Sequence, residues 1–477
     1  MTETTDKHTQ GFPDWLKLLL WSAAMALFFV GMRPLWVPDD GRYAEVAREM
    51  VVTGDWITPQ LNFTPHYSKP PLTYWTSAGA MELFGKNEFA VRLAVALPFI
   101  ACVLLTFLLA AEFRDRKTGF IAGLILMSSP IPFVAANIIT PDMLLACCEL
   151  GAIYFIWRWH KREQKTIGNL LFAYLFLGLA FLTKGPVGLL IPFLAFFGYA
   201  AYSRDWRILR AFASLRGWIL CLFIGLTWYV VLVIRHPELW DYFLGHELAD
   251  RMFTTIHHRN NSFIIYPAVL LGGLLPWTIY FVKGWIRALP WKKFRARKIE
   301  STHVFLLSWI VLPLIFFSIV RSRLPLYVLP LFVPMAILAG DLLANLAGTS
   351  NGRRKAVQIA VVMSVVLMGL QVGASYYPSH QNLYPIVQRM RTAELDNPIL
   401  YSNRDDLYPL NFYMGARIEP MDDYQKFLDD SLPAFYVLDR TGTAENLPEQ
   451  FRHLPVLIHY YNFWLFSNRP VDAGTNM

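Results

Sequence analysis

The chain has 477 residues, of which 55% are hydrophobic, 15% aromatic and only 16% charged. Together with a mean hydropathy of +0.35, this composition is too apolar for an ordinary soluble domain. A net charge of +8 could indicate nucleic-acid binding, but the basic residues lie mainly in loops between apolar segments. We therefore expect membrane lipids as the surroundings and no nucleic-acid partner.

Apolar segments of about the length that a bilayer requires recur along the chain. The sequence predicts a polytopic α-helical membrane protein with about eleven transmembrane helices. The predicted spans are Trp15–Met32, Glu88–Ala111, Thr118–Ala136, Met143–Trp159, Asn169–Thr183, Pro186–Tyr202, Gly217–Ile234, Phe263–Val282, His303–Val320, Leu326–Leu342 and Ala356–Tyr376.

Basic loops follow every second span and therefore share one face, which the positive-inside rule makes cytoplasmic. We expect a multi-pass membrane protein, with a membrane domain over residues 1–376 and a first non-cytoplasmic loop over residues 33–87. Residues 377–477 should form a small α/β domain on the non-cytoplasmic side. Its predicted elements are a helix over 422–428 and strands over 399–402, 434–439 and 456–466.

The first non-cytoplasmic loop contains the sequence P-D-D-G-R-Y-A-E-V-A-R-E-M, at residues 38–50. An apolar stripe at helical spacing predicts a short helix that lies flat on the membrane interface. Asp40 is placed to cap its start and Gly54 to end it. The stripe consists of Tyr43, Val46, Ala47, Met50 and Val51.

A second short helix is predicted from Pro71 to Phe84, and Lys69 stands just before its start, where anions bind well. Asp39 and Lys69 therefore suggest a site for a negatively charged lipid. The plainer alternative is that Asp39 only caps a helix and Lys69 only reaches the lipid head groups.

Other outward turns carry charged residues at the membrane edge. Asp142 begins a predicted span, where a carboxylate is costly and usually functional, although it could simply cap the helix. Lys184 lies in a turn between two spans and could be only an interface anchor. Arg321 and Arg323 lie on the outer face against the positive-inside trend, and arginine suits phosphate binding.

The outer loop from residue 235 to 262 is long and polar. Glu247 and Arg251 could form a simple helical ion pair or take part in a site. His258 could bind a metal, although loop histidines are more often surface residues.

No nucleotide-binding motif is visible, so this set of charges suits transfer of a group from a lipid phosphate carrier. Cations would hold the donor phosphate and stabilise the charge that develops as it leaves. A carboxylate would orient or deprotonate the attacking oxygen. The alternative of another class is a transporter or flippase of a lipid-linked sugar, in which the same charges only bind cargo.

The first-loop motif, followed by G-D-W at residues 54–56 and S-K-P-P-L-T-Y-W at residues 68–75, resembles the bacterial aminoarabinose transferases that modify lipid A. These enzymes belong, with the protein O-mannosyltransferases, to the integral-membrane C-type glycosyltransferases. The resemblance covers the whole membrane part. It continues through Pro141-Asp142, Thr183-Lys184-Gly185, Glu247 with Arg251, His258-Arg259, Leu275-Pro276-Trp277 and Arg321–Tyr327.

The resemblance implies an inverting glycosyltransferase with an undecaprenyl-phosphate-linked sugar as donor and lipid A or another envelope molecule as acceptor. Asp39 then matches the catalytic acidic position and Asp142 the second functional aspartate. The resemblance implies that Lys69, Arg251 and Tyr327 hold the donor, that His258 stands near the metal of the family, and that the site faces the periplasm at the bacterial inner membrane. We further expect substrate contacts from Arg42, Tyr43, Lys184, Glu247, Arg321 and Arg323.

The chain departs from the family at two positions. Asp40 replaces the glutamate of the usual P-D-E, and Ser68 replaces an acidic residue on the metal side. We expect no organic cofactor, and a divalent metal remains an open question. The shorter tail also leaves open an acceptor that is a protein or another glycan.

Overall fold

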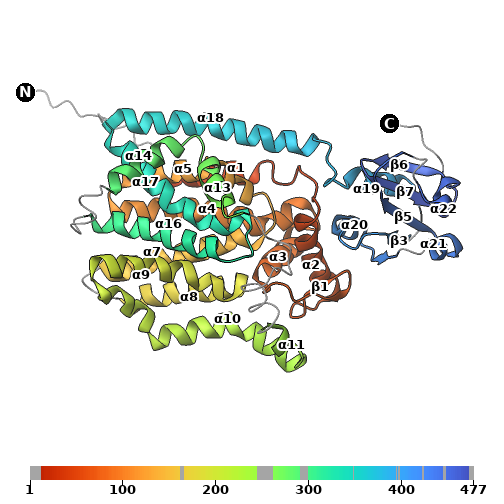
Figure 1. The fold of residues 1–477 in the computed structure, drawn as a ribbon, viewed down its shortest axis with the longest axis horizontal. Coiled ribbons are helices and arrows are strands. Elements are labelled where there is room, and N and C mark those ends of the chain that lie inside the picture. The colour runs from red at the N-terminus through yellow and green to blue at the C-terminus, as the bar shows by residue number, and fades with distance from the viewer. Residues whose placement is uncertain are drawn as a thin grey trace, which may run out of the picture.

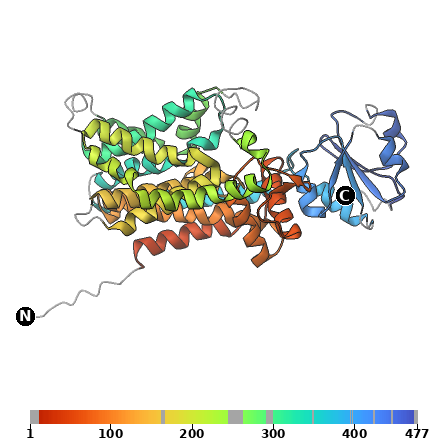
Figure 2. The same ribbon diagram turned by 90° about the horizontal axis from the view of Figure 1, so that it is seen from below.

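The computed structural model describes residues 12–161, 166–243, 262–289, 299–346, 349–393, 395, 398–421, 424–443 and 447–471. Long helices run side by side as a bundle, and a β-sheet formed by the C-terminal residues lies beyond one end of it (Figures 1 and 2). The short helices of the first loop lie between the bundle and the sheet (Figure 1). The elements that matter for a site therefore meet at this end.

The bundle consists of twelve helices among the described residues. Six helical runs are long and apolar enough to cross a membrane, or seven if one bent pair counts as a span. The chain is thus a multi-pass helical membrane protein. The helices are α1 (Asp14–Leu27), α4 (Glu88–Phe113), α5 (Arg116–Met127), α7 (Pro141–Lys161), α8 (Ile167–Lys184), α9 (Leu190–Ser203), α10 (Leu215–Arg235), α13 (Ile265–Gly273), α14 (Thr278–Ala288), α16 (Ser301–Ile319), α17 (Phe332–Asn345) and α18 (Thr349–Tyr376).

Shorter elements connect these helices. They are β1 (Gln60–Leu61), β2 (Thr64–Pro65), α6 (Pro130–Ala135), η1 (Gly185–Leu189), η2 (Trp206–Ala213), α11 (Leu239–Asp241) and η4 (Pro325–Leu331).

Two predicted spans are wrong as single helices. The span over 118–136 breaks after α5, because Pro130 begins α6 and proline has no N–H to continue the helical pattern. The span over 263–282 is a pair, α13 and α14, bent by 109°. Pro276 lies in the break, where a continuous hydropathy pattern gave no sign of the bend.

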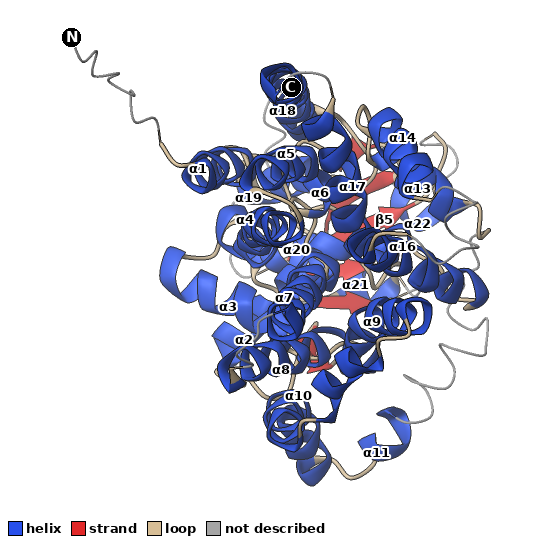
Figure 3. Cartoon of the chain, turned by 90° about the vertical axis from the view of Figure 1, so that its left-hand side faces the viewer, coloured by secondary structure: helices blue, strands red, loops and turns tan. Residues whose placement is uncertain are grey.

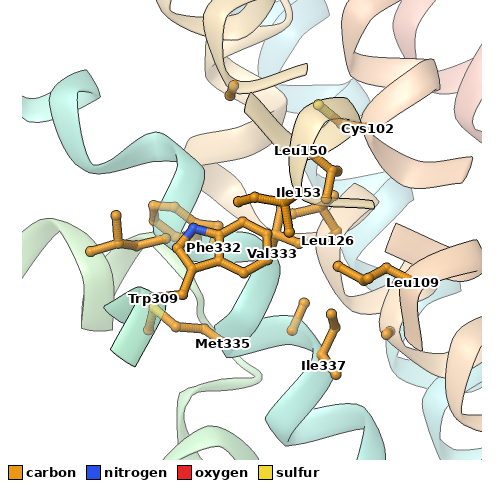
Figure 4. Close-up of a cluster of buried hydrophobic side chains, with 14 of the residues drawn as sticks. Cys102, Leu109, Leu126, Leu150, Ile153, Trp309, Phe332, Val333, Met335 and Ile337 are labelled. Carbon is orange, nitrogen blue, oxygen red and sulfur yellow. The ribbon is translucent and has the colours of Figure 1, made fainter. Parts of the chain in front are cut away.

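The interior of the bundle is a cluster of closely packed side chains, seen end-on in Figure 3 and in close-up in Figure 4. Trp309 from α16 and Phe332 from α17 lie against aliphatic side chains of α5 and α7, and both rings are fully buried. Small residues let helices approach, since a Cβ at Gly340 would come 3.1 Å from the backbone of Ala122. Because lipid tails are also apolar, close packing rather than exclusion of water stabilises these contacts.

The predicted first-loop helices are confirmed as α2 (Asp39–Thr53) and α3 (Leu72–Phe84), and α2 ends at Gly54 with φ of 71°. The prediction that the apolar face of α2 lies on the membrane is wrong, however. Tyr43, Val46, Ala47 and Met50 are buried against protein, chiefly α3 and the later helix α20 (Tyr408–Met414). A short amphipathic helix shows one apolar face, but its sequence does not say whether lipid or protein covers it.

Asp40 does not cap α2, which corrects the second expectation for this helix. Its carboxylate accepts hydrogen bonds from Arg33 at 2.5 Å, Arg92 at 3.0 Å and the Ile139 backbone N–H at 2.8 Å. The side chain is 2% exposed. Burial alone would raise the pKa of Asp40, but Arg33 and Arg92 hold it below its usual value.

The C-terminal residues form a five-stranded sheet in the order β4-β3-β5-β7-β6. Strands β3 (Ile399–Ser402) and β5 (Ala434–Asp439) have the predicted bounds and pair in parallel. The predicted strand over 456–466 is instead an antiparallel hairpin. The other elements are β4 (Ile418–Pro420), β6 (Val456–Tyr460), β7 (Phe463–Ser467), α19 (Tyr384–Thr392), α21 (Gln425–Asp429) and α22 (Glu449–Arg452).

Candidate active site

Asp39 is the first residue of α2, and its carboxylate pairs with Arg42 one turn along the helix. The Asp39 side chain is 46% exposed, in contrast to its buried neighbour Asp40. Asp39 is therefore placed to meet a substrate, whereas Asp40 holds the loop together.

Lys69 lies close to this pair, in the turn before α3. His66 and Ser68 are hydrogen-bonded through Nε2 and Oγ at 2.7 Å, and Lys69 Nζ donates to the Ser68 carbonyl at 2.7 Å. Burial, together with the charges of Arg42 and Lys69, lowers the pKa of His66 to about 4. Two cations and a neutral imidazole thus lie together, an arrangement that suits an anionic ligand.

The second aspartate and the lysine of the membrane-edge turns also lie together. Asp142, in the first turn of α7, forms an ion pair with Lys184 at the end of α8. The Lys184 ammonium lies 4.2 Å from the centroid of the Tyr327 ring in η4. Three turns that are distant in sequence therefore form one cluster, as predicted, although Asp142 and Lys184 pair with each other in this structure.

Tyr43 connects the two clusters. Its ring stacks on Tyr74 with centroids 5.4 Å apart. Burial raises the pKa of the Tyr43 phenol well above its usual value, and Tyr74 and the carboxylates of Asp39 and Asp142 raise it further. Both aspartates therefore lie near enough to this buried phenol to act on it electrostatically, as does Arg42 with the opposite sign.

The arginines before η4 differ from one another. Arg323 is half-buried, donates from Nη2 to the Ser318 carbonyl at 2.8 Å, and interacts electrostatically with Tyr266, as Tyr327 also does. Arg321 is exposed, and no hydrogen bond or ion pair joins it to these groups in the described part of the chain. The structure brings Arg323 toward the site but not Arg321.

Three expected site residues, Glu247, Arg251 and His258, fall within 244–261 and lie outside the described residues. Among the residues that are described, no group of three or more His, Cys, Asp or Glu side chains could hold a metal ion. At Ser68 the neighbouring charges are those of Lys69 and, near His66, Arg42. Positive charge at His66 and Ser68 opposes a divalent metal at these two residues, and a metal site that includes His258 stays a prediction.

Sequence reasoning missed the buried support of the first loop. Arg92 of α4 is 1% exposed and donates to the backbone carbonyls of Val30, Arg33 and Pro34 at 2.5–3.0 Å. A charged residue inside an apolar span usually has a partner or a function. The position of Arg92 in such a span was therefore the one sequence feature that could have indicated this buried network. Its partner Asp40 lies 52 residues away, a pairing that no local pattern indicates.

The two arginines before η4 give a matched test. We expect Arg323→Ala to weaken binding of a polyprenyl phosphate about tenfold to a hundredfold, since a charged hydrogen-bonding group contributes roughly 1.5–3 kcal/mol. Arg321→Ala should change the affinity less than twofold. Titration of the purified variants with undecaprenyl phosphate measures both values, and equal losses would contradict the assignment of Arg323 to the site.

Glu49 in α2 gives a pH-dependent prediction. Burial, together with the neighbouring carboxyl group of Glu45, raises the pKa of Glu49 from an ordinary 4.5 to about 8. The folded state then holds a proton that the unfolded state releases, so stability falls as pH rises from 4.5 through 8. Glu49→Gln removes this titration, and its melting temperature should fall less than that of the wild type between about pH 6 and pH 9. Identical slopes would contradict the prediction.

Comparison with known proteins identifies the family. Residues 68–231 match the family described as dolichyl-phosphate-mannose-protein mannosyltransferase. The undecaprenyl phosphate-alpha-4-amino-4-deoxy-L-arabinose arabinosyl transferase of Aeromonas salmonicida (strain A449) is 30% identical over 380 residues, which cover 76% of this chain and 68% of the relative. The chain belongs to this transferase family. The Aeromonas hydrophila subsp. hydrophila enzyme of the same name is 31% identical over 376 residues, covering 75% of this chain and 66% of the relative.

The transferase is therefore an enzyme rather than a transporter. Its fold agrees with the crystal structure of ArnT from Cupriavidus metallidurans bound to undecaprenyl phosphate, with a TM-score of 0.81 at 23% identity. The superposition covers 97% of this chain and 99% of the other, so the C-terminal sheet and the bundle both lie within the shared architecture.

Proposed function

We propose that the enzyme transfers an aminoarabinose group from undecaprenyl phosphate to lipid A at the periplasmic face of the bacterial inner membrane. The main support is its similarity to relatives whose names specify undecaprenyl phosphate and 4-amino-4-deoxy-L-arabinose. The Asp39–Arg42 pair and the Asp142–Lys184 pair beside Tyr327 support a reacting centre at the end of the bundle where the first loop lies. About eleven transmembrane helices would place the C-terminal sheet on the periplasmic side.

In the proposed reaction, the bond between the sugar's anomeric carbon and the donor phosphate oxygen breaks. A new bond forms from that carbon to an oxygen of the acceptor phosphate, with inversion, and undecaprenyl phosphate leaves with the electron pair. Lys69 and Arg42 would stabilise the charge that builds on the leaving phosphate. An ionised acceptor oxygen has no proton to lose, so Asp39 would orient the reacting groups rather than act mainly as a base.

The acceptor is tested by mass spectrometry of lipid A from cells with and without the enzyme. We expect one added amino-pentose on a lipid A phosphate, present with the wild type and absent with the Asp39→Asn variant at equal protein level. Unmodified lipid A in both strains would contradict lipid A as the acceptor. It would instead favour the alternative of transfer to a protein or another glycan.

A further inference from the structure

The helices α9 and α10 are joined by the short 3₁₀-helix η2 (Trp206–Ala213), at the end of the bundle opposite the candidate active site. Lys184 ends α8 at the site, and α9 leads away from it. The runs on both sides of η2, Ile167–Ser203 and Leu215–Arg235, are long and apolar enough to cross a membrane, and α10 lies at the edge of the bundle (Figures 1 and 3). This short helix therefore lies at the membrane surface, on the side that the positive-inside rule makes cytoplasmic.

The side chains of η2 fall into three rows, because residues three apart align in a 3₁₀-helix. Ile208 and Ala211 form the row that is buried in the core of the bundle. Trp206 belongs to a second row and is 53% exposed, and tryptophan is common at membrane–water interfaces. Arg207 and Arg210 belong to the third row, and both are exposed. Apolar, aromatic and basic rows together are typical of a helix that lies in the head-group region.

Contacts with the neighbouring membrane helices hold the backbone of η2. The Tyr174 hydroxyl of α8 donates to the Ala211 carbonyl at 3.0 Å, and the Trp218 indole N–H of α10 donates to the Phe212 carbonyl at 2.8 Å. The Phe212 ring also packs edge-on against Phe193 of α9, with centroids 5.7 Å apart. Because the backbone is fixed, the arginine row is in place before a ligand binds, which lowers the entropy cost of binding.

The segment around η2 carries positive charge that its own acid does not neutralise. Asp205 is the only acidic residue between positions 204 and 216. Its carboxylate accepts from the Arg207 backbone N–H at 3.2 Å and lies 3.5 Å from His160 Nε2. Within the described part of the chain, no ion pair with a carboxylate engages the four exposed arginines of the segment, Arg204, Arg207, Arg210 and Arg216. Their guanidinium groups are thus available to an anion from outside the chain.

We propose that Arg207 and Arg210, with Trp206 beside them, bind the head group of an anionic phospholipid of the cytoplasmic leaflet. Arginine can form two hydrogen bonds to one phosphate group, and a phospholipid at this depth presents its phosphate to the arginine row. Phosphatidylglycerol, which is negatively charged, should bind better than phosphatidylcholine, whose choline cation opposes the arginines. The site lies at the opposite end of the bundle from Asp39, so the proposal does not depend on the transfer reaction.

Native mass spectrometry of the purified enzyme, titrated with either phospholipid, tests the binding. We expect Arg207→Gln/Arg210→Gln to weaken binding of the first phosphatidylglycerol about tenfold or more, since each arginine near an anionic lipid contributes a several-fold factor. Binding of phosphatidylcholine should not change. The matched control is Lys283→Gln/Arg287→Gln, which removes the same charge from exposed positions of α14 on the cytoplasmic side and should bind both lipids like the wild type. Equal losses in the two double variants, or no loss in the first, would overturn the proposal.

Hydrogen exchange of the enzyme in nanodiscs locates the bound lipid. Exchange of residues 204–216 should be slower in nanodiscs of phosphatidylglycerol than in nanodiscs of phosphatidylcholine, and Arg207→Gln/Arg210→Gln should abolish this protection. Residues 66–71 at the opposite end are the reference, because Lys69 could also attract a lipid phosphate. Protection confined to the reference segment, or protection of residues 204–216 that the double variant retains, would show that the arginine row is not the binding site.

Discussion

Replacing Asp39 with asparagine should lower the transfer rate by about a hundredfold or more while the protein stays folded and inserted. The carboxylate is 46% exposed and its ion pair with Arg42 is at the surface, where such pairs contribute little to stability. The change removes the charge but keeps the shape of the side chain. Transfer from the undecaprenyl-phosphate-linked donor by purified enzyme in liposomes measures the effect.

Binding of undecaprenyl phosphate is the control for Asp39→Asn. Because the phosphate ligands on the protein are cations, the affinity should be equal to or higher than that of the wild type once a nearby negative charge is removed. If the purified variant transferred sugar at the wild-type rate, Asp39 would have no catalytic part, whatever its position in the family motif.

The same substitution one residue later should have the opposite outcome. Asp40→Asn leaves Arg33 and Arg92 buried without the carboxylate that both pair with, and breaking such a buried pair costs roughly 3–5 kcal/mol. We expect a much lower melting temperature and a lower yield of folded protein. The molecules that do fold should retain most of their activity, because Asp40 is 2% exposed and does not face the substrate.

The acid sensitivity of the wild type should depend on this residue. Because the folded-state pKa of Asp40 is held below its usual 3.8, the charged pair adds stability above that value. This contribution is lost as pH falls through the lower folded-state pKa. If Asp40→Asn melted at the same temperature as the wild type at neutral pH, the buried ion-pair network would contribute nothing to the stability of the fold.

The sequence predicted best what depends on local pattern. The apolar spacing in the first loop and the glycines after it gave α2 and α3 nearly residue by residue, and β3 and β5 followed from runs of strand-forming residues. The functional residues came from unusual positions, such as Asp142 and Lys184 at span ends. Their pairing with each other required the fold.

Long-range contacts explain what the sequence could not supply. The sequence around Asp40 is as compatible with a helix cap as with a buried ion pair. Only the contact with Arg92 in the folded protein shows that Asp40 is an ion-pair partner. No local sequence feature indicates that Tyr408 and Pro409 of α20 are neighbours of α2, because this contact joins segments more than 300 residues apart. The bend between α13 and α14 was also hidden, since hydropathy measures composition and not direction.

The most direct test is a structure of the enzyme in a lipid bilayer with undecaprenyl phosphate bound. The lipid phosphate should lie within hydrogen-bonding distance of Lys69 or Lys184, with Asp39 and Asp142 on either side of the reacting position. A phosphate bound remote from both lysines, with the two aspartates facing separate surfaces, would contradict a single active site at this end of the bundle.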